Sequence, residues 1–159
     1  MGWALQLHET WYALTTTVMQ TLEYPLLALT LSARDCLYIM APILSRGLPA
    51  CSICCNFPHD IIYAPLKFQG VGLKNPFITM GLLHMATIVE EGQAPSITGS
   101  LICASIEAAK LELGLGSTLI QSNYHYFRKL ATDCWLAHSW KFIHDYNIEL
   151  VEGTPILPI

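Results

Sequence analysis

The stretch that most restricts the fold is residues 75–92, NPFITMGLLHMATIVEEG. It opens with Asn75 and Pro76, a typical N-cap residue followed by a proline whose missing N–H costs nothing in a first helical turn. Four apolar residues then recur at spacings of four, three and four, as on one face of a helix: Ile78, Leu82, Met85 and Val89. Gly92 follows as a stop signal, so the pattern predicts a helix from Pro76 to this glycine.

Two more helices are predicted on the N-terminal side. Residues 9–22 carry one apolar stripe, formed by Trp11, Leu14, Val18 and Leu22, and Pro25 is expected to end that helix. Ser32 and Asp35 resemble a capping box at the start of the second helix, which Gly47 and Pro49 close. Pro42 lies inside this second pattern, where it should kink the helix or split it into two short turns.

Residues 48–75 are rich in proline and glycine and predict a connector, with one helical turn after Pro58. A fourth helix, which ends at Gly114, is indicated by Ile102, Ile106, Ala109 and Leu113. The last helix begins near Thr132 or Asp133 and buries Leu136, Trp140 and Ile143, while its apolar face is widened by Trp135, Phe142 and Tyr146. The tail, with Ile148, Leu150 and Ile156, either adds a short strand or runs over the surface.

These patterns predict a mainly α protein of about five helices with a Pro/Gly-rich connector. The polar stretch 92–100 is the best internal boundary, so we expect two regions, 1–91 and 92–159.

The composition of the 159 residues is unusually apolar, at 53% hydrophobic and 13% charged. This composition excludes a disordered chain. It also suggests that part of the apolar surface is covered by groups outside the chain, as in a fragment of a larger protein. Charged residues interrupt every long apolar run, and the start lacks a secretory pattern, so we expect no membrane span and an intracellular location. The net charge of −4 has the wrong sign for a chain that binds phosphates by itself, so any nucleic-acid contact must be local or made with help.

The six cysteines are best interpreted as reduced thiols, since no export signal accompanies them. Cys51, Cys54 and His59 have the spacing that opens a zinc knuckle, but Ala64 stands where the fourth ligand would be. Cys134 and His138 could complete a site from a distance. Buried thiols with a surface histidine are the favoured alternative, so we expect no metal and no cofactor.

Four basic residues are candidates for nucleic-acid contact: Lys67, Lys74, Arg128 and Lys129. The last two follow the rings Tyr124, Tyr126 and Phe127, a mixture that can stack on bases. The alternative is an ordinary helix with an aromatic inner face and a solvated outer face. No nucleophile elbow, zinc-protease motif, phosphate loop or aspartate pair is present in the sequence, so we expect no enzyme activity.

Over residues 11–90 the sequence resembles the region that follows the polymerase core in reverse transcriptases of LINE-like retrotransposons. The resemblance is carried by Tyr24-Pro25-Leu26, Ala28, Leu31-Ser32, Cys36, Ile39-Met40, Pro42, Gly47-Leu48-Pro49, Phe57-Pro58, Tyr63, Pro65-Leu66-Lys67, Gly70-Val71-Gly72-Leu73, Asn75, Gly81 and His84. The second half is similar to the helical stretch that comes next, through Cys134-Trp135, Trp140-Lys141-Phe142 and Ile148-Glu149-Leu150.

The resemblance implies a non-catalytic thumb- or linker-like region, because the metal-binding aspartates of the polymerase would lie upstream. Arginines tend to stand beside the Phe57-Pro58 position in that family, and Cys55 and His59 replace them here, which argues against template binding at this point. The implied partners are the rest of the polyprotein and, through it, RNA or DNA. The alternative is a stand-alone helical module that buries the same apolar surface in a homo-oligomer.

Overall fold

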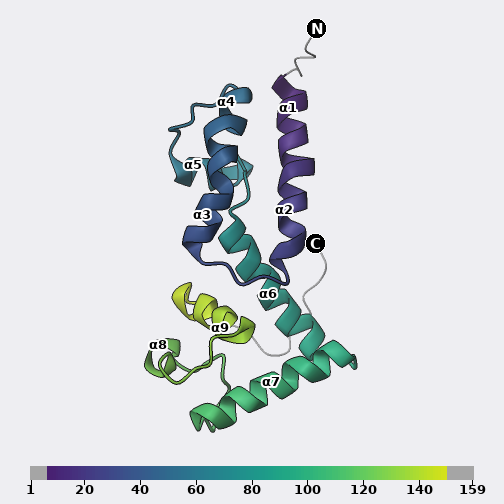
Figure 1. Cartoon of the computed structure of the whole chain (residues 1–159), viewed down its shortest axis with the longest axis vertical. Coiled ribbons are helices and arrows are strands. Elements are labelled where there is room, and N and C mark those ends of the chain that lie inside the picture. Colours follow the sequence, from purple (N-terminus) through teal and green to yellow (C-terminus); the bar gives the residue numbers. More distant parts are fainter. Residues whose placement is uncertain (1–6, 150–159) are drawn as a thin grey trace. The chain divides into compact units, whose positions relative to one another are not determined.

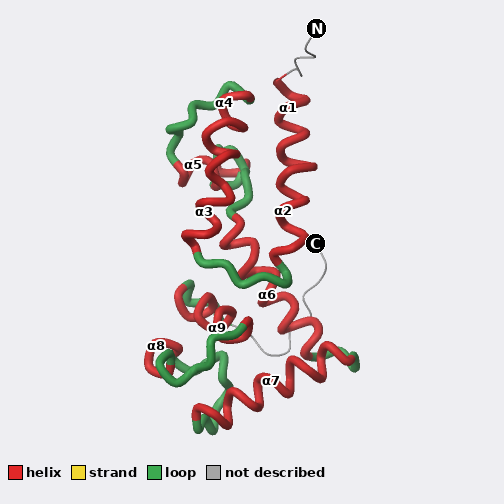
Figure 2. Tube along the Cα trace, in the orientation of Figure 1, coloured by secondary structure: helices red, strands yellow, loops and turns green. Residues whose placement is uncertain are grey.

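The computed structural model describes residues 7–149, which form helices joined by turns and loops, with no strand among them (Figures 1 and 2). The predicted mainly α fold is confirmed. The chain divides into two compact units, Met1–Leu83 and His84–Ile159, and helix α6 (Pro76–Gly92) contributes to both. The division into regions 1–91 and 92–159 stays a prediction, because a packing unit need not fold independently. Within the described residues, no helix is long and apolar enough to cross a membrane.

The first helical rod contains α1 (Leu7–Ala13), a π-helical turn (Leu14–Val18) and α2 (Met19–Leu26). The backbone stays helical through the junctions, and the hydroxyls of Thr15, Thr16 and Thr21 donate to carbonyls four residues back, a pattern that competes with regular helix bonding. The prediction that Pro25 ends the helix is wrong, since α2 continues to Leu26. Pro25 cannot donate to the Thr21 carbonyl four residues back, so one bond of the ladder is lost, and the helix ends one residue later.

The second rod contains α3 (Ala33–Pro42), a π-helical turn (Ile43–Gly47) and α4 (Leu48–Ala50). The predicted capping box is confirmed: the Asp35 backbone N–H donates to Ser32 Oγ over 3.2 Å, and the Ser32 N–H donates to Asp35 Oδ2 over 3.0 Å. Pro42 does not split the rod, because the wider π turn follows it directly and keeps the backbone helical up to Cys51.

The connector is compact despite its irregular backbone. The predicted turn after Pro58 is present as α5 (His59–Tyr63), and a 3₁₀ turn follows (Leu66–Phe68). A Cβ on Gly70 would lie 2.0 Å from the Ala64 carbonyl oxygen, so only glycine fits where these two turns approach.

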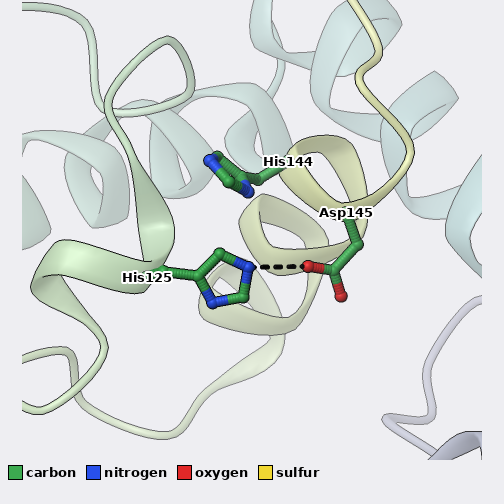
Figure 3. A group of neighbouring side chains, drawn as sticks. All are labelled: His125, His144 and Asp145. Atoms are coloured by element: carbon green, nitrogen blue, oxygen red, sulfur yellow. Dashed lines mark ion pairs between the residues drawn. The ribbon is translucent and has the colours of Figure 1, made fainter.

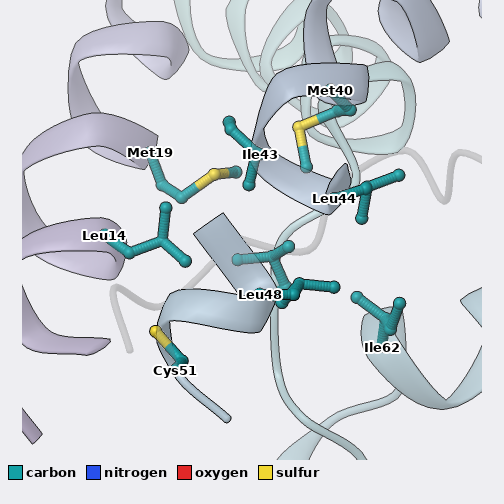
Figure 4. Packing of buried hydrophobic residues seen from close by; sticks show 9 residues of the cluster. Leu14, Met19, Met40, Ile43, Leu44, Leu48, Cys51 and Ile62 are labelled. Carbon is teal, nitrogen blue, oxygen red and sulfur yellow. The ribbon is translucent and has the colours of Figure 1, made fainter. Parts of the chain in front are cut away.

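The core of the first unit joins both rods to the connector. Figure 4 shows these side chains converging around Leu48, and both Leu48 and Ile62 are fully buried. The cluster consists of Leu14, Met19, Met40, Ile43, Leu44, Leu48, Cys51, Ile62 and Leu73. The π turns supply Leu14, Ile43 and Leu44 to it, so both irregular turns face the core.

Helix α6 has the predicted bounds, and the Asn75 side chain accepts a hydrogen bond from the Phe77 N–H over 3.0 Å. Helix α7 (Ile97–Leu113) starts earlier than its apolar pattern indicated, because Ser96 caps it by accepting from the Gly99 N–H. Gly114 ends it in the left-handed conformation, at φ 65°.

The core of the second unit gathers around α9 (Trp135–Asp145), with the short helix α8 (Tyr124–Phe127) packed against it. The predicted burial of Leu136, Trp140 and Ile143 is confirmed, and Trp140 is only 1% exposed. The strand predicted for the tail involves Leu150 and Ile156, which lie outside the described residues.

Candidate functional site

Three side chains of the kinds that can bind metal ions meet where α8 approaches the last turn of α9. His125 comes from α8, and His144 and Asp145 are the final two residues of α9 (Figure 3). His125 Nε2 lies 3.2 Å from Asp145 Oδ1, and one ligand atom from each residue lies within 4.8 Å of the other two. Within residues 7–149 this is the one group of at least three histidine, cysteine or acidic side chains arranged to hold a metal ion.

Trp140 positions the two helices that carry these residues. Its ring packs edge to face on Tyr124 at 5.2 Å and lies over Phe127 at 6.3 Å, and both of these rings belong to α8. Its indole N–H donates to the Ser122 carbonyl over 2.8 Å, which fixes the loop that precedes α8. The Asn123 side chain then accepts from the His125 N–H and starts α8. Burial of one tryptophan therefore sets the place of His125 relative to α9.

The carboxylate of Asp145 and the end of α9 attract positive charge at this point, and Lys141 already supplies one such charge. Asp145 binds Lys141 through Oδ2 over 2.6 Å, while its Oδ1 faces His125. The negative end of the α9 dipole lies at the same place, since His144 and Asp145 are its last residues. The rings of His125 and His144 meet edge to face with centroids 4.8 Å apart.

One polar atom of this group has no protein partner. His144 Nδ1 is buried and makes no hydrogen bond, which is unusual for a buried polar atom. His144 also lines an open groove of about 530 Å³, together with Ile120, Gln121, Ser122, Ile143, Asn147, Ile148 and Glu149. His144 thus lies beside a groove whose wall combines polar residues with three isoleucines.

A second feature is the outer face of α7. Five apolar residues there recur at spacings of four, three, four and three and are all exposed; we call them the outer stripe: Ile97, Leu101, Ala104, Ala108 and Leu111. The predicted pattern forms the opposite, inner face: Ile106, Ala109 and Leu113 join the core of the second unit, and Ile102 is half-buried. Helix α7 therefore carries apolar residues on two faces, and only one of them is covered.

The cysteine and histidine residues weighed for zinc do not form a site among the described residues. Cys51 is buried in the core of the first unit, and burial raises the pKa of its thiol, which disfavours the thiolate that binds metal. Cys54 and His59 are exposed, and the His59 ring meets Tyr63 edge to face. The distant candidate His138 pairs instead with Asp133, at 2.9 Å.

The basic residues weighed for nucleic acid are divided between the two units. Lys74 forms an ion pair with Glu23 over 2.8 Å, and Lys67 lies over the Phe68 ring. Arg128 and Lys129 are exposed just after α8. Tyr124 and Phe127 turn inward onto Trp140 and leave only Tyr126, 80% exposed, beside these cations. Most of the expected stacking surface is thus used for packing, and nucleic-acid contact stays a prediction.

Sequence reasoning missed the group of His125, His144 and Asp145. No short spacing joins them, because 18 residues separate the two histidines. The available signal was the pair His144-Asp145 at the end of a predicted helix, close to the tryptophan expected to organise that helix.

Comparison with known proteins identifies no relative of this chain. The chain matches no protein-family model, no curated protein and no solved structure. The resemblance to reverse transcriptases therefore rests on the sequence positions quoted above.

Proposed function

We propose that this chain is a non-catalytic helical scaffold of a larger, reverse-transcriptase-like polypeptide, and that it docks onto the rest of that polypeptide through the outer stripe of α7. The observation that carries the proposal is the exposure of this stripe. Ile97 is 83% exposed, Leu101 63% and Leu111 82%, although their spacing is that of a helix-packing seam.

The size of this surface favours a partner within the same polypeptide. Covering an isoleucine or leucine stabilises by about 1.5–3 kcal/mol, so the three large residues contribute about 5–9 kcal/mol at most. Association of separate molecules costs about 4–15 kcal/mol in lost translational and rotational freedom, which offsets most of that gain. A tethered partner avoids much of this cost, because linkage raises its effective concentration to about the millimolar range.

The partner that fits is a helix with its own apolar seam. Ala104 and Ala108 lie at the centre of the outer stripe, where small side chains allow another helix to approach closely. Leu101 and Ala108 also line a groove of about 410 Å³ whose other wall includes Trp135 and Leu136. This groove extends the apolar surface beyond α7 itself.

A scaffold role is favoured over direct template contact. The ion pair with Glu23 neutralises Lys74, and the Phe68 ring covers one side of Lys67. The six free cysteines agree with the intracellular setting that such a polypeptide requires. In this proposal the parent protein is an RNA-directed DNA polymerase, and its catalytic aspartates lie in another part of the polypeptide.

The alternative function is a stand-alone module that pairs two copies of the outer stripe. It is favoured by the alanines of the stripe, which suit the close approach of two identical helices.

Two measurements test the proposal. The first is the genomic reading frame upstream of Met1, which should encode a polymerase palm with paired aspartates. The second is binding of the purified palm-containing segment to this chain. The double variant Leu101→Glu and Leu111→Glu should weaken it at least tenfold, whereas Cys103→Glu, an exposed α7 position outside both the stripe and the groove beside it, should leave it unchanged. A separate gene without a palm, together with a dimer that the same double variant dissociates, would establish the alternative instead.

A further inference from the structure

We propose that His125, His144 and Asp145 form a binding site for one divalent transition-metal ion of the Zn²⁺ class, with the fourth coordination position left to water or to an external ligand. The site is independent of the outer stripe of α7.

The spacing of the ligand atoms is close to what zinc requires. Tetrahedral Zn²⁺ holds nitrogen and oxygen ligands at about 2.0–2.1 Å, which places neighbouring ligand atoms about 3.3–3.4 Å apart. His125 Nε2 and Asp145 Oδ1 already lie 3.2 Å apart. The widest separation in the group is within 4.8 Å, so the third ligand needs a shift of about 1.5 Å or less, which a ring rotation supplies.

The kinds of ligand select the class of metal. Two imidazoles and one carboxylate suit Zn²⁺ and its first-row neighbours, whereas Mg²⁺ and Ca²⁺ prefer sites built from oxygen atoms. Three protein ligands with a fourth position open are typical of metal sites that bind water or substrate. The exposed fractions of the His125 and Asp145 side chains, 52% and 30%, leave this fourth position accessible.

The unpaired ring nitrogen of His144 is a separate observation that supports a metal site. Its Nδ1 is buried without a hydrogen-bond partner, although buried polar atoms are nearly always paired. Metal binding resolves this, either by direct coordination of Nδ1 or by turning the ring so that Nδ1 reaches the wall of the adjoining groove, where Gln121 and Asn147 supply polar atoms.

Apart from this ring rotation, the neighbouring groups already hold the site together. Lys141 holds Asp145 Oδ2 at 2.6 Å and thereby orients Oδ1 toward His125, in the way that outer partners orient metal-binding carboxylates. The carbonyl end of α9 adds negative potential at the same point. Trp140 keeps α8 against α9, so little order has to be gained on binding.

The consequence for the molecule is a clamp between α8 and the end of α9. An ion held by both helices binds the folded second unit and not the unfolded chain, so it stabilises that unit by mass action. The clamp would also fix one wall of the 530 Å³ groove that His144 lines.

The test uses the complete, reduced chain titrated with Co²⁺, followed by competition with Zn²⁺. Cobalt bound by nitrogen and oxygen gives visible absorption without the near-ultraviolet band of cobalt–thiolate bonds. This distinction matters because Cys54, Cys55, Cys103 and Cys134 are exposed. We expect one Co²⁺ per chain, no thiolate band, and displacement by Zn²⁺.

Three variants and one matched control decide the assignment. His125→Gln, His144→Ala and Asp145→Asn should each weaken Co²⁺ and Zn²⁺ binding at least tenfold. The control is His138→Ala, which removes another histidine paired with an aspartate, at 2.9 Å from Asp133, and should leave binding unchanged. His125 is exposed, so its variant remains informative if the half-buried His144 variant unfolds.

Several outcomes would overturn the proposal. These are the absence of Co²⁺ binding at millimolar concentration, a thiolate band in the bound spectrum, or affinity that His125→Gln and Asp145→Asn leave unaltered. None of these outcomes bears on the proposed function, because the outer stripe is a different surface. The double variant Leu101→Glu and Leu111→Glu should therefore bind the metal as the parent chain does.

Discussion

Truncation of Trp140 to alanine is the sharpest test of how the second unit is held together. The ring is 1% exposed and contacts Tyr124 and Phe127, so its removal leaves a cavity between α8 and α9. Removing a buried tryptophan costs about 3–5 kcal/mol. The variant also deprives the Ser122 carbonyl of its 2.8 Å hydrogen bond from the indole, which adds about 1 kcal/mol. We therefore expect a loss of about 4–6 kcal/mol, much of the ~5–15 kcal/mol that a domain holds.

The measurement is urea unfolding followed by far-ultraviolet circular dichroism, with the parent chain and Trp140→Ala side by side. Trp140→Phe separates the two contributions, since it keeps much of the ring volume and loses the hydrogen bond. Trp140→Phe should lose less than half of the stability that Trp140→Ala loses. Tyr126→Ala, on the same short helix but 80% exposed, is the control and should change stability by less than about 0.5 kcal/mol.

A stability loss below about 1 kcal/mol for Trp140→Ala would refute the reasoning. It would mean that the ring does not hold α8 to α9, and the placement of His125 beside Asp145 would lose its structural cause.

Three further predictions concern other parts of the chain. The hydrogen bonds from Ser32 lower the pKa of Asp35 below the ordinary value of an aspartate, so the ionised carboxylate stabilises α3 above that ordinary value, and this contribution is lost as the pH falls through the lowered pKa. Acid titration by circular dichroism should show Asp35→Asn to be less acid-sensitive than the parent. A Cβ on Gly99 would lie 2.2 Å from the Glu91 carbonyl oxygen, so Gly99→Ala should cost about 1–3 kcal/mol in urea unfolding, whereas Gly92→Ala, with open space around it, should be nearly neutral. Burial raises the pKa of two of the cysteine thiols, so an aromatic disulfide reagent at pH 8 should titrate four thiols quickly and two only upon unfolding. Six fast thiols would contradict the packing of the first core.

The predictions that the structure confirmed depend on interactions between residues close in sequence. The capping box of Ser32 and Asp35 joins residues three apart, and the start of α6 at Asn75 and Pro76 needs only neighbouring residues. The burial of Trp140 followed from the apolar spacing of one helix. Such local signals stabilise an element in almost any tertiary context, which is why they can be recognised in a single sequence.

Other features depend on packing between distant residues. The wider turn after Pro42 places Ile43 and Leu44 in a core that they share with Leu14 and Ile62, and those partners lie outside the second rod. Helix α7 has two apolar faces with similar spacing. The inner face is the covered one because Ile88, Leu119 and Leu136 pack on that side in the folded chain. His125 meets Asp145 because Trp140 joins α8 to α9 across a loop. Side chains separated by about twenty residues become neighbours only when the intervening chain folds back, and the free energy for that comes from the core rather than from the site residues themselves.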